Sequence, residues 1–205
     1  MEGVYERVDS VYENGEIKRV RVLRGPSPIV LGLKNPDRVK AEQASGAPGK
    51  TEPVFITSTR FLMECYRYLM QRETEVLHDV SGISHNGIYT LENLEALEIK
   101  ESSFTRAKSD LISTNRTLVR LEKFGLLLTG IFHSHPGRGS SSVTPSATDI
   151  RNQRKYEKVG YTCVGGIFSR DGWVRFFSAG LKFEVVVKGK GVHRAGDNLY
   201  RITFH

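Results

Sequence analysis

The stretch from Thr129 to Asp149 reads TGIFHSHPGRGSSSVTPSATD. It begins within an apolar run from Phe124 to Phe132 that is typical of a buried strand, so His133 and His135 lie at the carboxyl end of that strand. Residues two apart on a strand project from the same face, so both imidazoles can face one metal ion. A proline then ends the strand, and the Gly/Ser-rich residues from Gly137 to Thr144 predict a loop.

A helix is predicted to begin directly after this loop. Ser146 is followed three positions later by Asp149, the spacing of a helix capping box, and the helix should end near Gly160. Asp149 would then lie in the first turn, where it can face the two histidines if the loop folds over. Two histidines and one carboxylate, with a fourth position for water, are typical of a catalytic rather than a structural zinc site.

Each part of this pattern also has a simpler explanation. Asp149 alone is as consistent with a helix-capping acid, Ser146 alone with an N-cap, and an isolated His-x-His pair with chance. The combination of strand, histidine pair, Gly-rich loop and capped helix is much harder to obtain by chance. We therefore interpret the stretch as a hydrolytic metal site.

These residues resemble the motif of the JAMM (MPN+) zinc metalloproteases. The run His-Ser-His-Pro-Gly-x-Gly is especially similar to the deubiquitinase of the proteasome lid, in the form of a prokaryotic, archaeal-type homologue. The resemblance implies that His133, His135 and Asp149 bind one Zn²⁺ per chain, and that Ser146 helps to hold the oxyanion of the tetrahedral intermediate. Thirteen residues separate His135 from Asp149, more than in the family pattern, so we expect an enlarged loop with unchanged ends.

The resemblance also implies a glutamate that acts as general base from an earlier core strand. Residues 73 to 82 read as a strand, and Glu75 is the matching position, with Glu73 as the alternative. The implied chemistry is metal-assisted amide hydrolysis, in which the base takes a proton from zinc-bound water and returns it to the leaving amine. His78 and Asp79 are unusual in a strand, but the zinc set is complete without them and we interpret both as structural.

The remaining chain predicts a mixed sheet flanked by helices, an α/β (α+β) arrangement. Helices are expected from Thr59 to Gln71, capped by Thr57-Ser58, and from Phe104 to about Lys123, because apolar residues recur there at helical spacing. Further strands are expected at residues 87–91 as the partner of 73–82, at 161–168 and 173–177 around an Asp-Gly turn, and at 181–187 and 199–204 around a polar segment at 188–198. This order agrees with the MPN/JAMM (cytidine-deaminase-like) fold that the resemblance implies for residues 53–205.

The first 52 residues precede the part that resembles the protease family. Residues 4–24 alternate as in strands around Asn14-Gly15, which predicts a β-hairpin, and residues 34–50 are poor in apolar side chains and predict a linker. We therefore predict an N-terminal extension at 1–52 and a metalloprotease domain at 53–205.

Composition sets broad limits on the function. With 39% hydrophobic and 26% charged residues, the chain is typical of a globular protein, and no apolar stretch or signal pattern points to a membrane. Cys65 and Cys163 form no Cys-x-x-Cys pair, so we expect buried thiols in a reducing cytoplasm, with a single disulfide as the alternative. The net charge is +7, but the Lys and Arg residues are scattered through the chain and no nucleic-acid-binding motif accompanies them.

The resemblance implies an isopeptidase that cleaves the bond between the C-terminal glycine of a ubiquitin-like modifier and a lysine. Its expected partners are that modifier, its conjugates and the proteasome or its regulatory ATPase; nucleic acid and membrane are not expected. Three alternatives stay open: processing of sulfur-carrier or other small-modifier precursors by the same site, a non-catalytic MPN scaffold, and a nucleic-acid binder.

Overall fold

The computed structural model describes residues 5–13, 16–25, 52–95, 99–103, 106–109 and 111–204, with side chains described in 52–95 and 117–204. The chain divides into two compact units, Met1–Asn35 and Pro36–His205. In the first, β1 (Tyr5–Glu13) and β2 (Glu16–Gly25) pair antiparallel, so the predicted hairpin is confirmed. The predicted linker at 34–50 lies outside the described residues.

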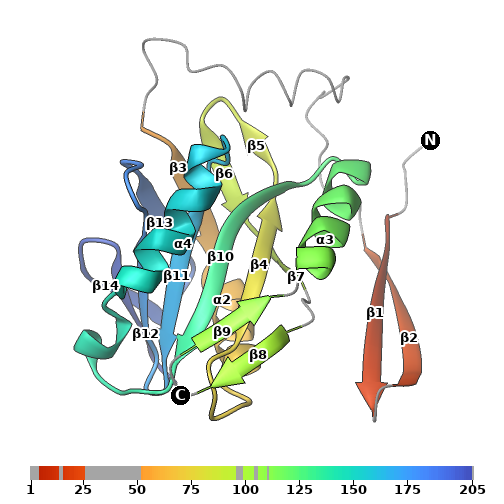
Figure 1. Ribbon diagram of the computed structural model, residues 1–205, viewed down its shortest axis with the longest axis horizontal. Helices are drawn as coiled ribbons and strands as arrows, with labels where there is room; N and C mark the ends of the chain where they lie inside the picture. Colours follow the sequence, from red (N-terminus) through yellow and green to blue (C-terminus); the bar gives the residue numbers. More distant parts are fainter. Residues whose placement is uncertain are drawn as a thin grey trace. The chain divides into compact units, whose positions relative to one another are not determined.

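Two mixed sheets form the framework of the second unit (Figure 1). The larger has the order β14-β15-β12-β11-β10-β4-β7, in which β10 and β11 are parallel and the other pairs antiparallel. Its strands are β4 (Leu77–Gly82), β7 (Asn93–Glu95), β10 (Leu127–His135), β11 (Val164–Ser169), β12 (Trp173–Phe177), β14 (Val192–Gly196) and β15 (Leu199–Ile202). The smaller has the order β13-β3-β6-β5, with strands β3 (Val54–Ser58), β5 (Ser84–His85), β6 (Ile88–Leu91) and β13 (Glu184–Lys188). The mixed α/β arrangement is thus confirmed.

The helices are α2 (Thr59–Leu69), α3 (Leu111–Lys123) and α4 (Ala147–Lys158). Ser58 caps α2, because its side chain accepts a hydrogen bond from the N–H of Phe61 at 3.0 Å, as predicted. The buried face of α2 packs with residues of both sheets in the main core, for example against Phe132 of β10. Figure 1 shows α4 lying over β11, which it contacts, and beside β10. Since neighbouring residues of a strand face opposite ways, His133 points away from the main core that holds Phe132.

Two predicted boundaries, one strand pairing and one segment predicted to have no strand were wrong. The helix expected from Phe104 begins at Leu111, and β8 (Ile99–Ser103) and β9 (Arg106–Ser109) form a hairpin before it. The strand expected from Glu73 begins at Leu77. That strand pairs with β10 and β7, whereas its expected partner at 87–91 belongs to the smaller sheet. The polar segment at 188–198 contains a strand, β14, whose exposed position at the sheet edge explains its polar sequence.

Candidate metal centre

His133 and His135 project from β10 on one side of the larger sheet. β10 lies between β4 and β11 and is buried over almost its whole length, so both histidines leave a rigid strand. The exposed fraction is 7% for His133, and the Nε2 atoms of the two rings lie 3.1 Å apart. The expectation that both imidazoles face one point is confirmed.

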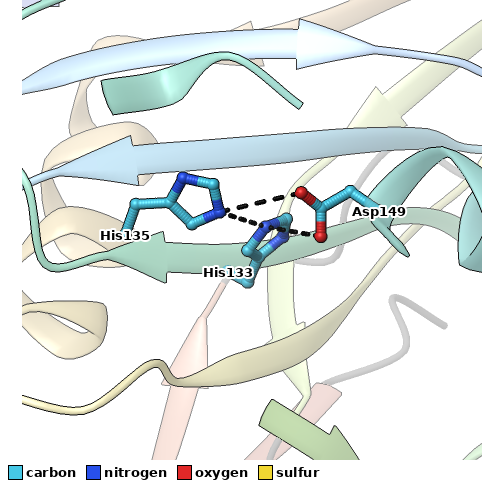
Figure 2. A group of neighbouring side chains, drawn as sticks. All are labelled: His133, His135 and Asp149. Carbon is cyan, nitrogen blue, oxygen red and sulfur yellow. Dashed lines mark hydrogen bonds and ion pairs between the residues drawn. The ribbon is translucent and has the colours of Figure 1, made fainter. Parts of the chain in front are cut away.

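Asp149 reaches the same point from the first turn of α4. Ser146 and Asp149 form the predicted capping box: the Ser146 hydroxyl accepts from the Asp149 N–H at 3.2 Å, and the Asp149 carboxylate accepts from the Ser146 N–H at 2.7 Å. These two hydrogen bonds hold the carboxylate beside the histidines (Figure 2). Its Oδ1 atom lies 3.4 Å from His133 Nε2, and its Oδ2 atom lies 3.7 Å from His135 Nε2.

The spacing of these three side chains fits a small tetrahedral ion. One ligand atom from each of His133, His135 and Asp149 lies within 4.8 Å of the others. Zinc bonds of about 2.0–2.1 Å in tetrahedral geometry separate two ligand atoms by about 3.3 Å. The two Nε2 atoms are 3.1 Å apart, and one or the other Asp149 carboxylate oxygen lies 3.4 Å from His133 and 3.7 Å from His135, so the group is compact enough for an ion of this size. Two imidazoles with one carboxylate are a common zinc donor set.

A hydrogen bond from the backbone leaves His135 ready to bind a cation. The Nδ1 atom of His135 lies 2.6 Å from the carbonyl oxygen of Ser142, and because a carbonyl only accepts, Nδ1 carries the proton. The lone pair of His135 is then on Nε2, which faces the site. Burial and the neighbouring His133 lower the pKa of His135, outweighing the effects of Ser142 and Asp149, which favours the neutral ring that a metal needs.

Asp149 is held as a carboxylate. Partial burial acts to raise its pKa, but the hydrogen bond and charge interaction with His133 and the hydrogen bonds from Ser146 outweigh burial and hold the pKa well below its usual range. The ligand set therefore combines one negative charge with a neutral imidazole over the neutral pH range.

The long loop between His135 and Asp149 is anchored along its length. Residues Ser140–Val143 form a 3₁₀ turn within the predicted loop, and Val143 is fully buried against Ile167 and Phe177. At Gly139, whose φ of 84° favours glycine, the N–H donates to the Asp171 carboxylate at 3.1 Å. The loop, which was expected to be enlarged, therefore contains a packed turn. The Ser142 carbonyl oxygen in this turn accepts a hydrogen bond from His135.

Glu75 reaches the edge of the same site. Its Oε1 atom lies 3.9 Å from His135 Nε2, and its side chain is 13% exposed. Glu75 precedes β4 rather than lying on it, so the expected place on a strand was wrong while the expected side-chain position agrees with the structure. Glu73 is exposed, which makes it the weaker alternative.

The sequence did not predict two groups that support the site, the Asp171 carboxylate and the Ser142 carbonyl. Asp171 was interpreted only as a turn residue, yet its carboxylate accepts from Gly139 and from the Ser169 hydroxyl and forms an ion pair with Arg201 at 3.0 Å. The Ser142 contribution is a backbone carbonyl, for which the sequence carries no side-chain signal. The Asp171-Gly172 turn and the Gly-rich loop at 137–144 were the sequence features from which this contact could have been inferred.

His78 and Asp79 lie on β4 outside the His133, His135 and Asp149 group. Both side chains are buried, with exposed fractions of 3% and 1%, and His78 Nδ1 lies 3.0 Å from the Glu95 carbonyl oxygen. Their positions agree with a structural role. Cys65 and Cys163 are free and buried, as expected, and burial raises the pKa of Cys163 to about 12, which makes it a poor nucleophile.

Comparisons with known proteins bear on the fold. No protein-family model matches this chain, and the search of curated proteins found no match. Among solved structures, the solution structure of protein DSY2949 from Desulfitobacterium hafniense is similar, with a TM-score of 0.50 and 17% sequence identity over 66% of this chain and 94% of that one. At this identity the likeness shows a shared fold and nothing about activity. Within the described residues, the helices are too short or too polar to span a bilayer.

Proposed function

We propose that this chain is a zinc-dependent isopeptidase of the JAMM (MPN+) type. The observation that carries the proposal is the convergence of His133, His135 and Asp149, from two separate elements, on one point with the Glu75 carboxylate at its edge. The motif resemblance supplies the reaction class, and the geometry supports it because the three implied ligands converge and the Glu75 carboxylate lies 3.9 Å from His135 Nε2.

Each residue has a distinct role in this proposal. Bound zinc would supply Lewis acidity, which lowers the pKa of water toward about 7 and polarises a carbonyl group. Glu75 accepts the proton of the attacking water and later donates it to the leaving amine. Ser146 is exposed at the start of α4, where its hydroxyl can donate to the oxyanion that develops.

The finer assignments belong to the same proposal. Residues 53–205 would have the MPN/JAMM (cytidine-deaminase-like) fold, with residues 1–52 as an extension that carries the hairpin. The substrate would be a ubiquitin-like modifier joined through its C-terminal glycine to a lysine, with the proteasome or its regulatory ATPase as a partner in the cytoplasm.

The test combines metal analysis with cleavage of a modifier–lysine conjugate. The unmodified protein, Glu75→Gln and the matched control Glu73→Gln are compared, because Glu75 borders the site and Glu73 is exposed. We expect about one zinc per chain in all three, cleavage by the unmodified protein and Glu73→Gln, and a loss of at least about 100-fold in Glu75→Gln. Zinc-loaded protein without cleavage would favour a non-catalytic scaffold and overturn the proposal.

The same assay separates the processing alternative. A C-terminally extended modifier and a modifier–lysine conjugate share the acyl glycine but differ in the leaving amine, which is a backbone nitrogen in the first and a lysine side chain in the second. Preference for the conjugate supports the isopeptidase assignment. Preference for the extended precursor would assign the same residues to maturation of small modifiers.

A further inference from the structure

Ser134 lies between the two histidines on β10 and faces the opposite side of the strand. It is 3% exposed and contacts the segment that carries Glu75. Its hydroxyl oxygen accepts a hydrogen bond from the Val76 N–H at 2.9 Å, and its own N–H donates to the Val76 carbonyl oxygen at 3.0 Å. One serine thus holds Val76 through both of that residue's backbone groups.

This contact lies just beyond the end of the β4–β10 ladder. The last paired residues are Leu77 and His133, and Val76 stands opposite Ser134 in the same register, but the Val76 N–H donates to the Ser134 hydroxyl instead of a backbone carbonyl. Val76 is 4% exposed, and a buried N–H without an acceptor is costly, so the Ser134 hydroxyl supplies the acceptor that the ladder no longer provides. The bond keeps the Val76 backbone joined to β10 beyond the end of the ladder.

The peptide group that Ser134 holds is the one that joins Glu75 to Val76, because the donated N–H belongs to that peptide. Holding this group fixes the backbone from which the Glu75 side chain starts. The carboxylate then lies 3.9 Å from His135 Nε2. The same strand therefore carries two candidate ligands on one face and, on the other, the side chain that binds the Glu75–Val76 peptide group.

We propose that Ser134 is a positioning residue for Glu75 and sets the place of the general base relative to the His133/His135 pair. This inference rests on the proposed function, since Glu75 is the base only in that reaction. Removal of the hydroxyl should displace the carboxylate without removing a ligand. Displaced supporting groups of this kind typically cost 10–100-fold, so we expect kcat to fall by about that factor with KM and zinc content unchanged.

The test uses the full chain with Ser134→Ala, Ser134→Thr, Glu75→Gln and the double variant Ser134→Ala/Glu75→Gln. Ser81→Ala is the matched control, because Ser81 is a fully buried serine of β4 whose hydroxyl donates to Glu95 at 2.6 Å, away from Glu75. We expect a lower kcat in Ser134→Ala, recovery in Ser134→Thr, a kcat near that of the unmodified protein in Ser81→Ala, and no further loss when Ser134→Ala is added to Glu75→Gln. Equal losses in Ser134→Ala and Ser81→Ala, or additive losses in the double variant, would overturn the inference.

A second readout does not depend on cleavage. The visible absorption of the cobalt-substituted proteins reports the surroundings of the metal, so Ser134→Ala should shift the bands in the same direction as Glu75→Gln, while Ser81→Ala should not. An unchanged spectrum in Ser134→Ala contradicts the inference even if the chain is an isopeptidase. If the bands shift alike in Ser134→Ala and Glu75→Gln but the unmodified protein does not cleave the conjugate, the proposed function is rejected. The link between Ser134 and Glu75 is then still supported. Ser134→Cys keeps a weak acceptor of similar size and should show a partial loss if Ser134→Ala does not fold.

Discussion

Asp79 is a buried acid whose charge has little compensation. Its side chain is 1% exposed, and its Oδ2 atom has no hydrogen-bond partner among the described residues. Burial, followed by the charge of Glu95 on the neighbouring strand, raises the pKa of Asp79 to about 7. Burial, followed by the charge of Asp79, also raises the pKa of Tyr156 on α4. Asp79 therefore lies within a buried polar region that includes this residue of α4.

This environment predicts a specific pH dependence of stability. Because the folded-state pKa is raised above the ordinary value of 3.8, the contribution of Asp79 is fully present below that value and is lost as pH rises to about 7. A shift of about three pKa units corresponds to at most about 4 kcal/mol. We expect Asp79→Asn to have a free energy of unfolding similar to that of the unmodified protein near pH 4 and to be the more stable of the two at pH 8.

Urea unfolding between pH 4 and pH 8.5, in the presence of a chelator, measures this difference. The chelator removes the contribution of bound metal, and Asp197→Asn is the control because that side chain is fully exposed. The control should follow the unmodified protein at every pH. Parallel pH curves for Asp79→Asn and the unmodified protein would mean that Asp79 is ionised in the folded protein and that its burial is compensated.

Ser146, at the start of α4, has a structural role and, in the proposed reaction, a chemical role. As N-cap, its hydroxyl accepts from the Asp149 N–H, and in the proposed reaction the same hydroxyl donates to the oxyanion. The two tasks can be separated, since alanine at an N-cap costs typically about 1 kcal/mol while glycine costs only a few tenths. We expect Ser146→Ala and Ser146→Gly to lose cleavage alike, by about 100-fold or more, and only Ser146→Ala to lose stability clearly.

The measurements are kcat with the conjugate and the midpoint of urea unfolding for the two variants. Thr148→Ala serves as the control, because Thr148 is exposed in the same helical turn. If the loss of cleavage in the two variants followed their loss of stability, Ser146 would act only as a cap, and the oxyanion would need another donor.

The sequence predicted the elements whose signals are local. The histidine pair, the capping box at Ser146 and Asp149 and the end of α4 all lie within one short stretch, so strand alternation and cap chemistry sufficed to predict them. Glu75 lies far from this stretch, and only the family resemblance singled it out. Ser134 was missed because its partner, Val76, is 58 residues away and is contacted through the backbone.

The wrong elements show where local pattern is ambiguous. The apolar spacing of Phe104, Ala107 and Leu111 suits a helix, but the chain forms a hairpin up to Ser109 and only then the helix. Strand partners at 77–82 and 87–91 could not be assigned from alternation, because alternation does not tell which sheet a strand joins. The register of long-range pairing, which places Glu75 beside His135, is equally invisible to local pattern.

At the scale of the molecule, the predicted division into 1–52 and 53–205 can be tested by truncation. The two mixed sheets lie between Val54 and Ile202, and β10 and α4 within this range supply all three candidate metal ligands. We therefore expect residues 53–205 alone to bind about one zinc per chain and to unfold cooperatively, with a melting temperature within a few degrees of that of the full chain. Loss of zinc or of the cooperative transition would assign a structural role to residues 1–52.

Metal binding should stabilise the whole second unit, because only the folded chain brings β10 and α4 together. A ligand that binds only the folded state adds RT ln(1 + [L]/Kd), which is about 4 kcal/mol at a free concentration of 1,000 times Kd. For a domain of this size each kcal/mol shifts the melting temperature by roughly 2–4 °C, so a chelator should lower it by about 10 °C. Zinc should restore the value and Mg²⁺ should not, because imidazole ligands suit zinc.

Two variants assign this stabilisation to the site. Asp149→Asn removes a charged ligand from the group with His133 and His135, so its melting temperature should barely respond to zinc. Asp197→Asn removes an equally acidic but fully exposed side chain and should respond as the unmodified protein does. A zinc-dependent shift that survives Asp149→Asn would place the ion elsewhere, and no shift in the unmodified protein would mean that the converging side chains hold no metal. The response to zinc therefore tests the candidate metal centre independently of any substrate.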